Sequence, residues 1–146
     1  MASSDRFRSQ HDELYKLALE IDAALSSAEY PGNAREVRRM MARLKGKLVV
    51  HSTMENDALY PRLLQHPDPV VRGRARAMFD DLGHIYEAVG DHHGAWSSVE
   101  RIQQDPRRYA DHTREIFAKL HRRMERENDE LYPLADREED DVPRSN

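Results

Sequence analysis

The chain has 146 residues, of which 34% are charged, with a formal net charge of -4 and a mean hydropathy of -0.91. These values favour one soluble helical domain and argue against a dedicated nucleic-acid binder. Cysteine is absent, which excludes disulfides, thiolate catalysis and cysteine-type zinc sites. No segment approaches the ~20 apolar residues of a membrane-spanning helix, and no signal-peptide core is present. We therefore predict a cytoplasmic protein with neither a nucleic-acid nor a membrane partner.

Turn and cap signals divide the chain into four long pieces. Residues 29–33 form the first break, where Asn33 is the predicted N-cap and Glu36 stands in the capping-box position. Residues 66–69 form the second break, where Asp68 can cap the next helix and a proline suits its first turn. Each signal predicts that one helix ends and another begins.

The third break runs from 97 to 106 and has room for a short helical turn at 98–104. Within each piece, apolar residues recur at 3- and 4-residue steps, as on the buried face of a helix. Short breaks between long helices imply antiparallel neighbours. We therefore predict an all-α fold, an up-down-up-down antiparallel four-helix bundle, over residues 1–136, followed by an acidic, disordered tail at 137–146.

Two segments carry a histidine followed four residues later by a glutamate. The pairs are His51 with Glu55 and His121 with Glu125. Residues four apart lie on one face of a helix, one turn from each other. Each pair can therefore present an imidazole and a carboxylate to the same metal ion.

The tripeptide Leu-Tyr-Pro follows each pair, at 59–61 and at 131–133. Because a proline interrupts a helix, we predict that Tyr60 and Tyr132 cap the end of the bundle rather than serve a site.

Counting from the breaks places four histidines at one height in the bundle. His11 and His51 each lie 18 residues from the first break, and His51 and His84 each lie 15 residues from the second. His121 lies 15 residues after the start of the fourth piece. In an antiparallel bundle, equal distances from a shared turn mean equal heights. Burying so many ionisable groups in one layer is costly without a metal, so we predict a site of nitrogen and oxygen ligands, which suit iron, manganese or zinc.

The His-x-x-x-Glu pairs on the second and fourth helices, with single histidines on the first and third, resemble the hemerythrin-like (HHE cation-binding) family over about residues 6–136. The resemblance implies a non-haem centre of two iron ions with an oxo or hydroxo bridge. The implied terminal ligands are His11, His51, His84 and His121, and the implied bridging carboxylates are Glu55 and Glu125. A ferritin-like centre is disfavoured because the sequence contains no Glu-x-x-His.

The sequence differs at one position from the oxygen carriers of that family. Those carriers typically have a second histidine one turn after the ligand on the third helix. Here that position is Ala88. The resemblance therefore implies the variety with four histidines and two carboxylates, which has an open coordination position. Tyr15, one turn from His11, is a candidate to approach the metals, and Glu87 and His92 are weaker candidates. A structural role is favoured for all three.

We therefore hypothesise a di-iron protein that binds or reacts with peroxide, nitric oxide or O₂ in a stress response, with catalase-like activity or iron-centre repair as its chemistry. The alternatives are an O₂ or iron sensing or storage module without turnover, and a structural bundle that holds zinc. Whether the protein is an enzyme, which small ligand it meets and its oligomeric state are left open by the sequence.

Overall fold

The computed structural model describes residues 4–141, and every regular element in that range is helical. The elements are α1 (Asp5–Leu25), α2 (Ala34–Met54), η1 (Glu55–Leu59), α3 (Tyr60–Leu64), α4 (Pro69–Ala95), α5 (Val99–Gln104), α6 (Pro106–Arg126), η2 (Glu127–Leu131) and α7 (Tyr132–Asp141). The symbol η marks a π-helical turn.

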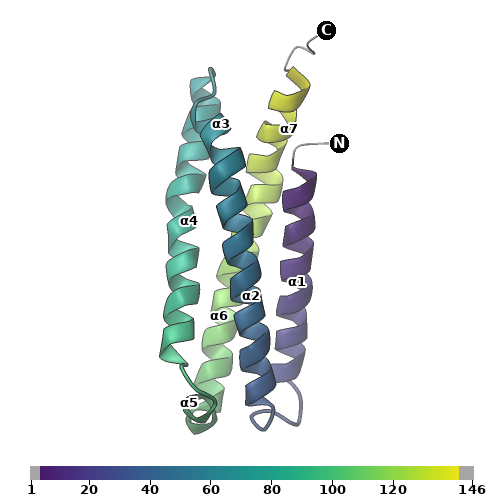
Figure 1. Ribbon diagram of the computed structural model, residues 1–146, viewed down its shortest axis with the longest axis vertical. Coiled ribbons are helices and arrows are strands. Elements are labelled where there is room, and N and C mark those ends of the chain that lie inside the picture. The colour runs from purple at the N-terminus through teal and green to yellow at the C-terminus, as the bar shows by residue number, and fades with distance from the viewer. Residues whose placement is uncertain (1–3, 142–146) are drawn as a thin grey trace.

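These elements form four long helical columns that run alternately up and down, as Figure 1 shows. The first column is α1, the second joins α2, η1 and α3, the third is α4, and the fourth joins α6, η2 and α7. The short α5 lies in the connection between the third and fourth columns. Helix α1 packs against α2 and α6, and α4 packs against α3 and α6. The predicted antiparallel four-helix bundle is confirmed.

The turn signals locate the helix starts, although one predicted cap does not form. The Asp68 carboxylate accepts a hydrogen bond from the backbone N–H of Val70 at 2.9 Å, as a capping residue should. Asn33 precedes α2, but its side-chain amide donates to the carbonyl oxygen of Ala24 at 3.0 Å and makes no capping hydrogen bond. The predicted capping box with Glu36 is therefore wrong, because the Asn33 side chain ties α2 to the end of α1.

The end of the chain also differs from the prediction. Helix α7 continues to Asp141, so the first residues of the predicted disordered tail at 137–146 are helical. Residues 142–146 of that tail lie outside the described residues.

The two columns that contain Leu-Tyr-Pro each include one π-helical turn just before it. In each turn the backbone N–H of the tyrosine bonds to a carbonyl five residues earlier, Tyr60 to Glu55 and Tyr132 to Glu127. The proline then follows as the second residue of a new α-helical segment, where its missing N–H is not needed. The expectation that these prolines interrupt the helices is therefore wrong, and α3 and α7 extend the columns.

The apolar core is divided into two clusters along the bundle. The larger cluster includes Leu14, Leu48 and Leu120, and the smaller one, toward the end where both termini lie, includes Leu59 and Leu131. The first, second and fourth columns carry buried polar residues between their contributions to the two clusters. A polar layer therefore crosses the core, and this layer holds the candidate site.

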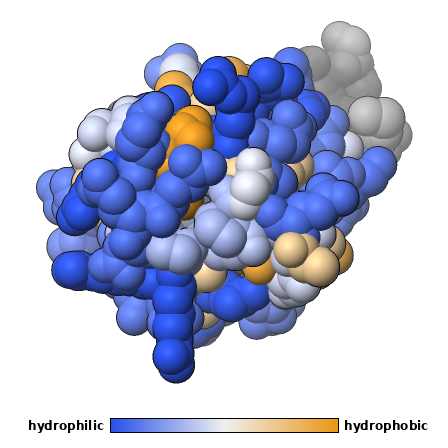
Figure 2. Space-filling model, turned by 90° about the horizontal axis from the view of Figure 1, so that it is seen from below, coloured by the Kyte–Doolittle hydropathy of each residue, from blue (hydrophilic) through white to orange (hydrophobic). Residues whose placement is uncertain are grey.

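The outer surface is strongly hydrophilic, as expected from the composition. Figure 2 shows mainly hydrophilic side chains over the end of the bundle that bears α5. None of the helices in the described part of the chain combines the length and the apolar character needed to cross a membrane.

Candidate metal centre

Four buried ionisable side chains from four different elements form the polar layer. They are His11 of α1, His51 of α2, Glu55 of η1 and Glu127 of η2, and none of them is more than 2% exposed. Each continues the buried stripe of its own column at a step of three or four residues, which directs it into the core. The layer therefore arises from helical periodicity, with ionisable residues at core positions.

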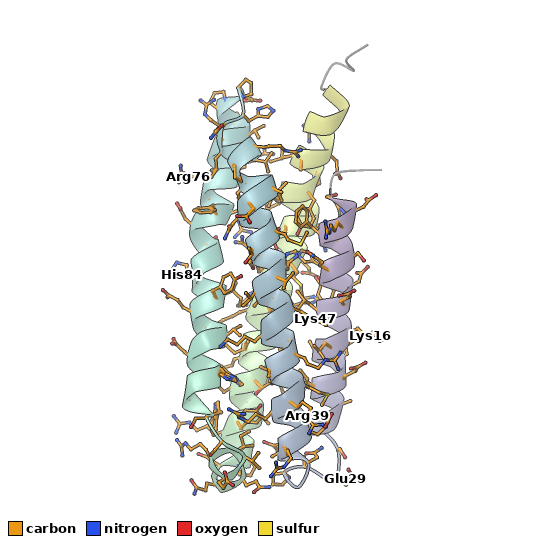
Figure 3. All side chains as sticks on the ribbon, in the orientation of Figure 1. Lys16, Glu29, Arg39, Lys47, Arg76 and His84 are labelled. Atoms are coloured by element: carbon orange, nitrogen blue, oxygen red, sulfur yellow. The ribbon has the colours of Figure 1, made fainter. Side chains whose placement is uncertain are left out.

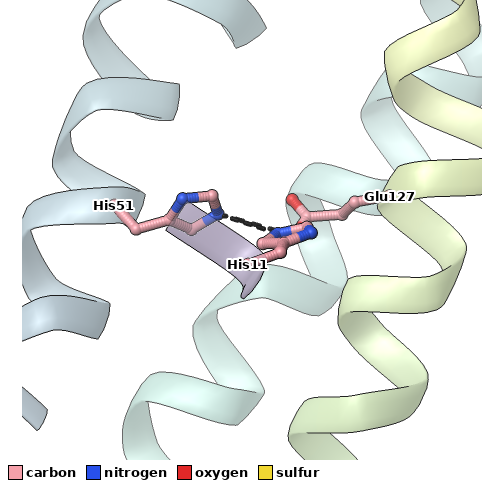
Figure 4. Close-up of side chains that lie close together, drawn as sticks. All are labelled: His11, His51 and Glu127. Atoms are coloured by element: carbon pink, nitrogen blue, oxygen red, sulfur yellow. Dashed lines mark hydrogen bonds and ion pairs between the residues drawn. The ribbon is translucent and has the colours of Figure 1, made fainter. Parts of the chain in front are cut away.

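The ligand-type atoms of these side chains converge. His11 Nε2 lies 3.1 Å from His51 Nε2 and 3.1 Å from Glu127 Oε1. Figure 4 shows these three side chains close together. Glu127 Oε1 is 3.8 Å from His51 Nε2, and Glu55 Oε1 is 3.0 Å from the same nitrogen. In the described part of the chain, one ligand atom each of His11, His51 and Glu127 lies within 4.8 Å of the other two, which makes a possible cation site. Glu55 lies beside this site.

Side-chain amides hold the outer nitrogen of each imidazole. His11 Nδ1 lies 2.9 Å from Asn128 Oδ1, and His51 Nδ1 lies 2.6 Å from Gln10 Oε1. An amide oxygen can only accept, so both Nδ1 atoms carry the proton that they donate. In the neutral imidazoles, both Nε2 atoms then present lone pairs toward the centre of the cluster. This is the arrangement by which outer partners orient metal-binding histidines.

Two buried tyrosines contact the carboxylates. The Tyr132 hydroxyl donates to Glu55 Oε2 at 2.8 Å and lies 3.0 Å from His11 Nε2. The Tyr60 hydroxyl lies 3.5 Å from Glu127 Oε2. Both side chains are 0% exposed, so the prediction that they cap the bundle end is wrong. The π-helical turns set the phase of the helix after them, and this phase directs both rings into the core.

The charges in the cluster alter one another's ionisation. Burial alone would lower the pKa of His51, but hydrogen bonds to Glu127 and Glu55 outweigh it and raise that pKa to about 9. Burial and the charge of Glu127 raise the pKa of Glu55 to about 7. Burial would also raise the pKa of Glu127, but hydrogen bonds from His11 and His51 hold it well below its usual value. Without a cation, protons therefore compensate the buried charge, and a metal ion would displace them.

The residues present fit a bound metal ion. When both imidazoles are neutral, two nitrogen lone pairs and two carboxylates face one another in the buried layer, which is a donor set for a cation. When His51 is neutral, Glu55 Oε1, which lies 3.0 Å from its Nε2, is a buried oxygen without a hydrogen-bond partner. An unpaired buried oxygen is costly, and a cation bound among these atoms would satisfy it. Two imidazoles and two carboxylates can hold iron, manganese or zinc.

Three of the predicted ligands do not lie in this cluster. His84 is exposed, and Figure 3 shows it at the outer edge of α4. His121 and Glu125 pair with each other at 2.9 Å on the surface, with side chains 55% and 57% exposed. The structure therefore brings together His11, His51 and Glu55 from the predicted set but not the other three.

Equal height in a bundle does not fix the direction in which a side chain points. Successive residues of a helix are rotated by about 100°, so two residues at nearly the same height can face opposite sides. His84 precedes the buried Ile85 by one residue, and His121 follows the buried Leu120 by one residue. Both histidines thus lie beside the core-facing stripe of their helix, and the prediction that they enter the core layer is wrong.

The secondary candidates also lie away from the cluster. The Tyr15 ring contacts the ring of His121, with centroids 5.0 Å apart, and is half-buried. Glu87 is exposed and Ala88 is half-buried against the larger apolar cluster. His92 is buried but donates from Nε2 to the Thr113 hydroxyl at 2.8 Å. His92 therefore has the structural role that was favoured for it.

Glu127 is the ligand-type residue that sequence reasoning missed, although the sequence contains a signal for it. The segments 55–61 and 127–133 both read Glu-Asn-Asp-x-Leu-Tyr-Pro. Aligning the repeat on these seven residues makes Glu127 the counterpart of Glu55. Aligning it on the His-x-x-x-Glu pairs instead selects Glu125, which lies two residues earlier and on another face of the helix.

The fold and the cluster together define a class: a four-helix bundle whose core contains histidine and carboxylate side chains suited to a cation. Residues 2–135 match the model of the hemerythrin HHE cation-binding domain. The chain therefore belongs to the hemerythrin HHE cation-binding family, as its sequence motifs indicated. A comparison of the chain with curated proteins found no match, and a comparison with solved structures found none.

Proposed function

We propose that the chain binds iron through His11, His51, Glu55 and Glu127, and that the bound metal binds or reacts with a small oxidant or gas such as peroxide, nitric oxide or O₂. The observation that supports this most directly is the convergence of their ligand atoms in a buried layer, with both outer imidazole nitrogens already held by amides. Family membership supports a cation in this position. Bound iron would supply a Lewis acid that can also exchange electrons.

The burial of the cluster supports a small reactant. His11 and Glu55 are 0% exposed, which leaves no surface for a large substrate to contact. A groove of about 760 Å³ between α1 and α6 is lined by Tyr15, His121 and Asn128 among others. Asn128 accepts the hydrogen bond from His11 Nδ1, so the groove reaches a direct neighbour of the cluster. A diatomic molecule or peroxide in this groove would be separated from the site by the Asn128 side chain.

Tyr132 is the residue of this chain that is best placed to assist a bound small molecule. Burial and the charges of Glu127 and Glu55 raise the pKa of its hydroxyl far above the ordinary value, so it keeps its proton. That proton now serves Glu55 Oε2, which is an acceptor that a metal ion would also engage. In the metal-bound protein, the hydroxyl can orient either this carboxylate or a small ligand beside it.

The matched variants Glu55→Ala and Glu125→Ala test the site. Both glutamates follow a histidine by four residues, but only Glu55 lies in the buried cluster. After anaerobic loading with ferrous iron, we expect Glu55→Ala to lose most of its bound iron, whereas Glu125→Ala keeps the wild-type content, measured by elemental analysis. Equal iron in both variants would contradict the assignment, and so would loss in Glu125→Ala alone.

The reaction is tested on the loaded wild-type protein. We expect its visible spectrum to change on adding peroxide, nitric oxide or O₂, and peroxide or nitric oxide to be consumed faster than by free iron. A fully reversible change with O₂ and no consumption would favour the alternative of sensing or storage without turnover. A colourless protein that retains zinc in preference to iron would contradict the redox proposal and favour a structural metal. A role in oxidative or nitrosative stress and a cytoplasmic location belong to the same proposal.

A further inference from the structure

The two halves of the bundle repeat one another, but the repeat is broken at one position. The segments 55–61 and 127–133 share the pattern Glu-Asn-Asp-x-Leu-Tyr-Pro, and each begins a π-helical turn with a buried glutamate. Four residues before Glu55 stands His51, one helical turn away on the same face. Four residues before Glu127 stands Arg123. The second half therefore places a guanidinium where the first half places an imidazole.

Arg123 is held at the cluster by buried partners. Its side chain is 7% exposed, and one guanidinium nitrogen lies 3.7 Å from Glu127 Oε2. The same nitrogen donates to the Tyr60 hydroxyl at 2.7 Å, and the other terminal nitrogen donates to the Met78 carbonyl oxygen at 2.6 Å. The guanidinium therefore lies on the side of Glu127 away from the histidines, since Oε1 of that carboxylate faces His11.

Among its described side chains, the third column supplies no ligand on this side. In the first half, α1 places His11 beside His51, whereas in the second half α4 places Met78 beside Arg123. Met78 offers a backbone carbonyl, which the guanidinium already occupies. The two histidines predicted to complete this half, His84 and His121, are both exposed.

We propose that this centre holds one metal ion per chain, and that Arg123 takes the place of the second cation of a two-metal site. The inference rests on the proposed function, because it assumes a metal among His11, His51, Glu55 and Glu127. A guanidinium keeps its charge at any pH a protein tolerates and offers no lone pair. A second metal ion at this position would meet a fixed positive charge at short range and would find no imidazole to bind it. Glu127 thus faces a metal with one oxygen and a guanidinium with the other.

The number of bound ions is the direct test. The full-length wild-type protein is titrated anaerobically with ferrous iron, and bound iron per chain is measured after removal of excess. We expect one ion per chain, and after oxidation we expect the electron paramagnetic resonance of an isolated ferric ion rather than that of a coupled pair. Two ions per chain would overturn this inference and leave the proposed function standing. No bound ion would overturn both.

The exclusion of a second metal ion by Arg123 is tested by restoring histidines in the second half of the bundle. The double variant Met78→His with Arg123→His places imidazoles on α4 and α6 as His11 and His51 stand on α1 and α2. We expect its iron content to rise from one to two ions per chain, with spin coupling appearing in the spectrum. A folded double variant that still binds one ion would contradict exclusion by the guanidinium. His121→Ala is the matched control, and we expect it to keep one ion; a loss of metal there would also overturn the inference.

Discussion

The two imidazoles of the cluster depend on neighbours that do not face the metal position. Asn128 and Gln10 accept from the outer nitrogens of His11 and His51, at 2.9 and 2.6 Å, and thereby select the tautomer with a free Nε2. Asn128 also borders the groove between α1 and α6. One amide therefore orients a ligand and contributes to the wall that separates it from solvent.

We expect Asn128→Ala to weaken metal binding on the order of 10- to 100-fold while leaving the helical content unchanged, since outer partners of metal-binding histidines have effects of this size. The measurement is the dissociation constant for ferrous iron at fixed pH, with circular dichroism as the folding check. Asn56→Ala is the matched control, because Asn56 occupies the same position of the repeat but is exposed. Equal losses of iron affinity in the two variants would contradict a specific role for the hydrogen bond between Asn128 and His11.

Helical stripes explain which site residues could be predicted from the sequence. His11, His51 and Glu55 continue stripes of buried apolar residues, so periodicity alone directs them inward. Glu127 continues the stripe of α6 in the same way, but the His-x-x-x-Glu pattern drew attention to Glu125. Two residues along a helix change the direction of a side chain by about 200°. A motif therefore locates a site only when its phase agrees with the buried face.

At the scale of single elements, the π-helical turns could not be predicted. Each adds one residue to a turn without a glycine, a break in the apolar pattern or any other local signal. The turn nevertheless decides that Tyr60 and Tyr132 face the cluster and that the following proline is tolerated. The order and the starts of the long helices were predictable, because they depend on local turn residues such as Asp68.

Glycines within the long helices reduce the stability of their elements. Gly46 of α2 is exposed, and a Cβ built on it meets nothing within 4 Å. We expect Gly46→Ala to raise the free energy of unfolding by about 0.5–1 kcal/mol, because alanine loses less backbone entropy in a helix. Chemical denaturation of the metal-free protein measures this change.

Gly32 provides the opposite case in the turn before α2. A Cβ there would lie 2.8 Å from the carbonyl oxygen of Glu29, which is too close for real side chains. We expect Gly32→Ala to lower the free energy of unfolding. Stabilisation by Gly32→Ala would mean that the turn adapts to the added Cβ, and it would contradict the predicted clash.

A third buried histidine, His92 of α4, links stability to pH. The Thr113 hydroxyl donates to the Tyr109 carbonyl and so accepts from His92 Nε2. Burial, aided by the charges of His112 and His93, lowers the pKa of His92 to about 4. The unfolded chain therefore binds a proton below its ordinary pKa of about 6.5 that the folded protein does not bind until about pH 4. This contribution to stability is complete above pH 6.5 and is lost as the pH falls to 4.

We expect wild-type protein to lose up to about 3 kcal/mol through this group between pH 6.5 and pH 4. Glutamine does not titrate, so the free energy of unfolding of His92→Gln should fall by that much less over the same pH range. The measurement is the difference between the two proteins in the free energy of unfolding at several pH values, with metal removed. Parallel pH profiles would show that His92 titrates normally in the folded protein.

Across the whole molecule, the bundle places its most costly layer between its two apolar clusters. Without this layer, the larger and the smaller apolar cluster would join into one continuous core. The layer that separates them consists of His11, His51, Glu55 and Glu127. Buried charges are expensive even when paired, so the metal-free protein carries a penalty that a continuous apolar core would not. A cation that binds only the folded chain offsets this penalty. The layer that weakens the fold is thus the layer that makes its stability depend on a metal.

We therefore expect the thermal midpoint of the protein to rise with the concentration of free ferrous iron under anaerobic conditions. At 100 times the dissociation constant, the added stability should be about 2.7 kcal/mol if one site is filled. Differential scanning calorimetry over a range of iron concentrations gives this dependence, and a chelator should reverse it. His51→Ala should show no such rise, whereas His121→Ala, altered on the surface, should follow the wild type. A midpoint independent of iron in the wild type would mean that the polar layer is compensated by protons alone.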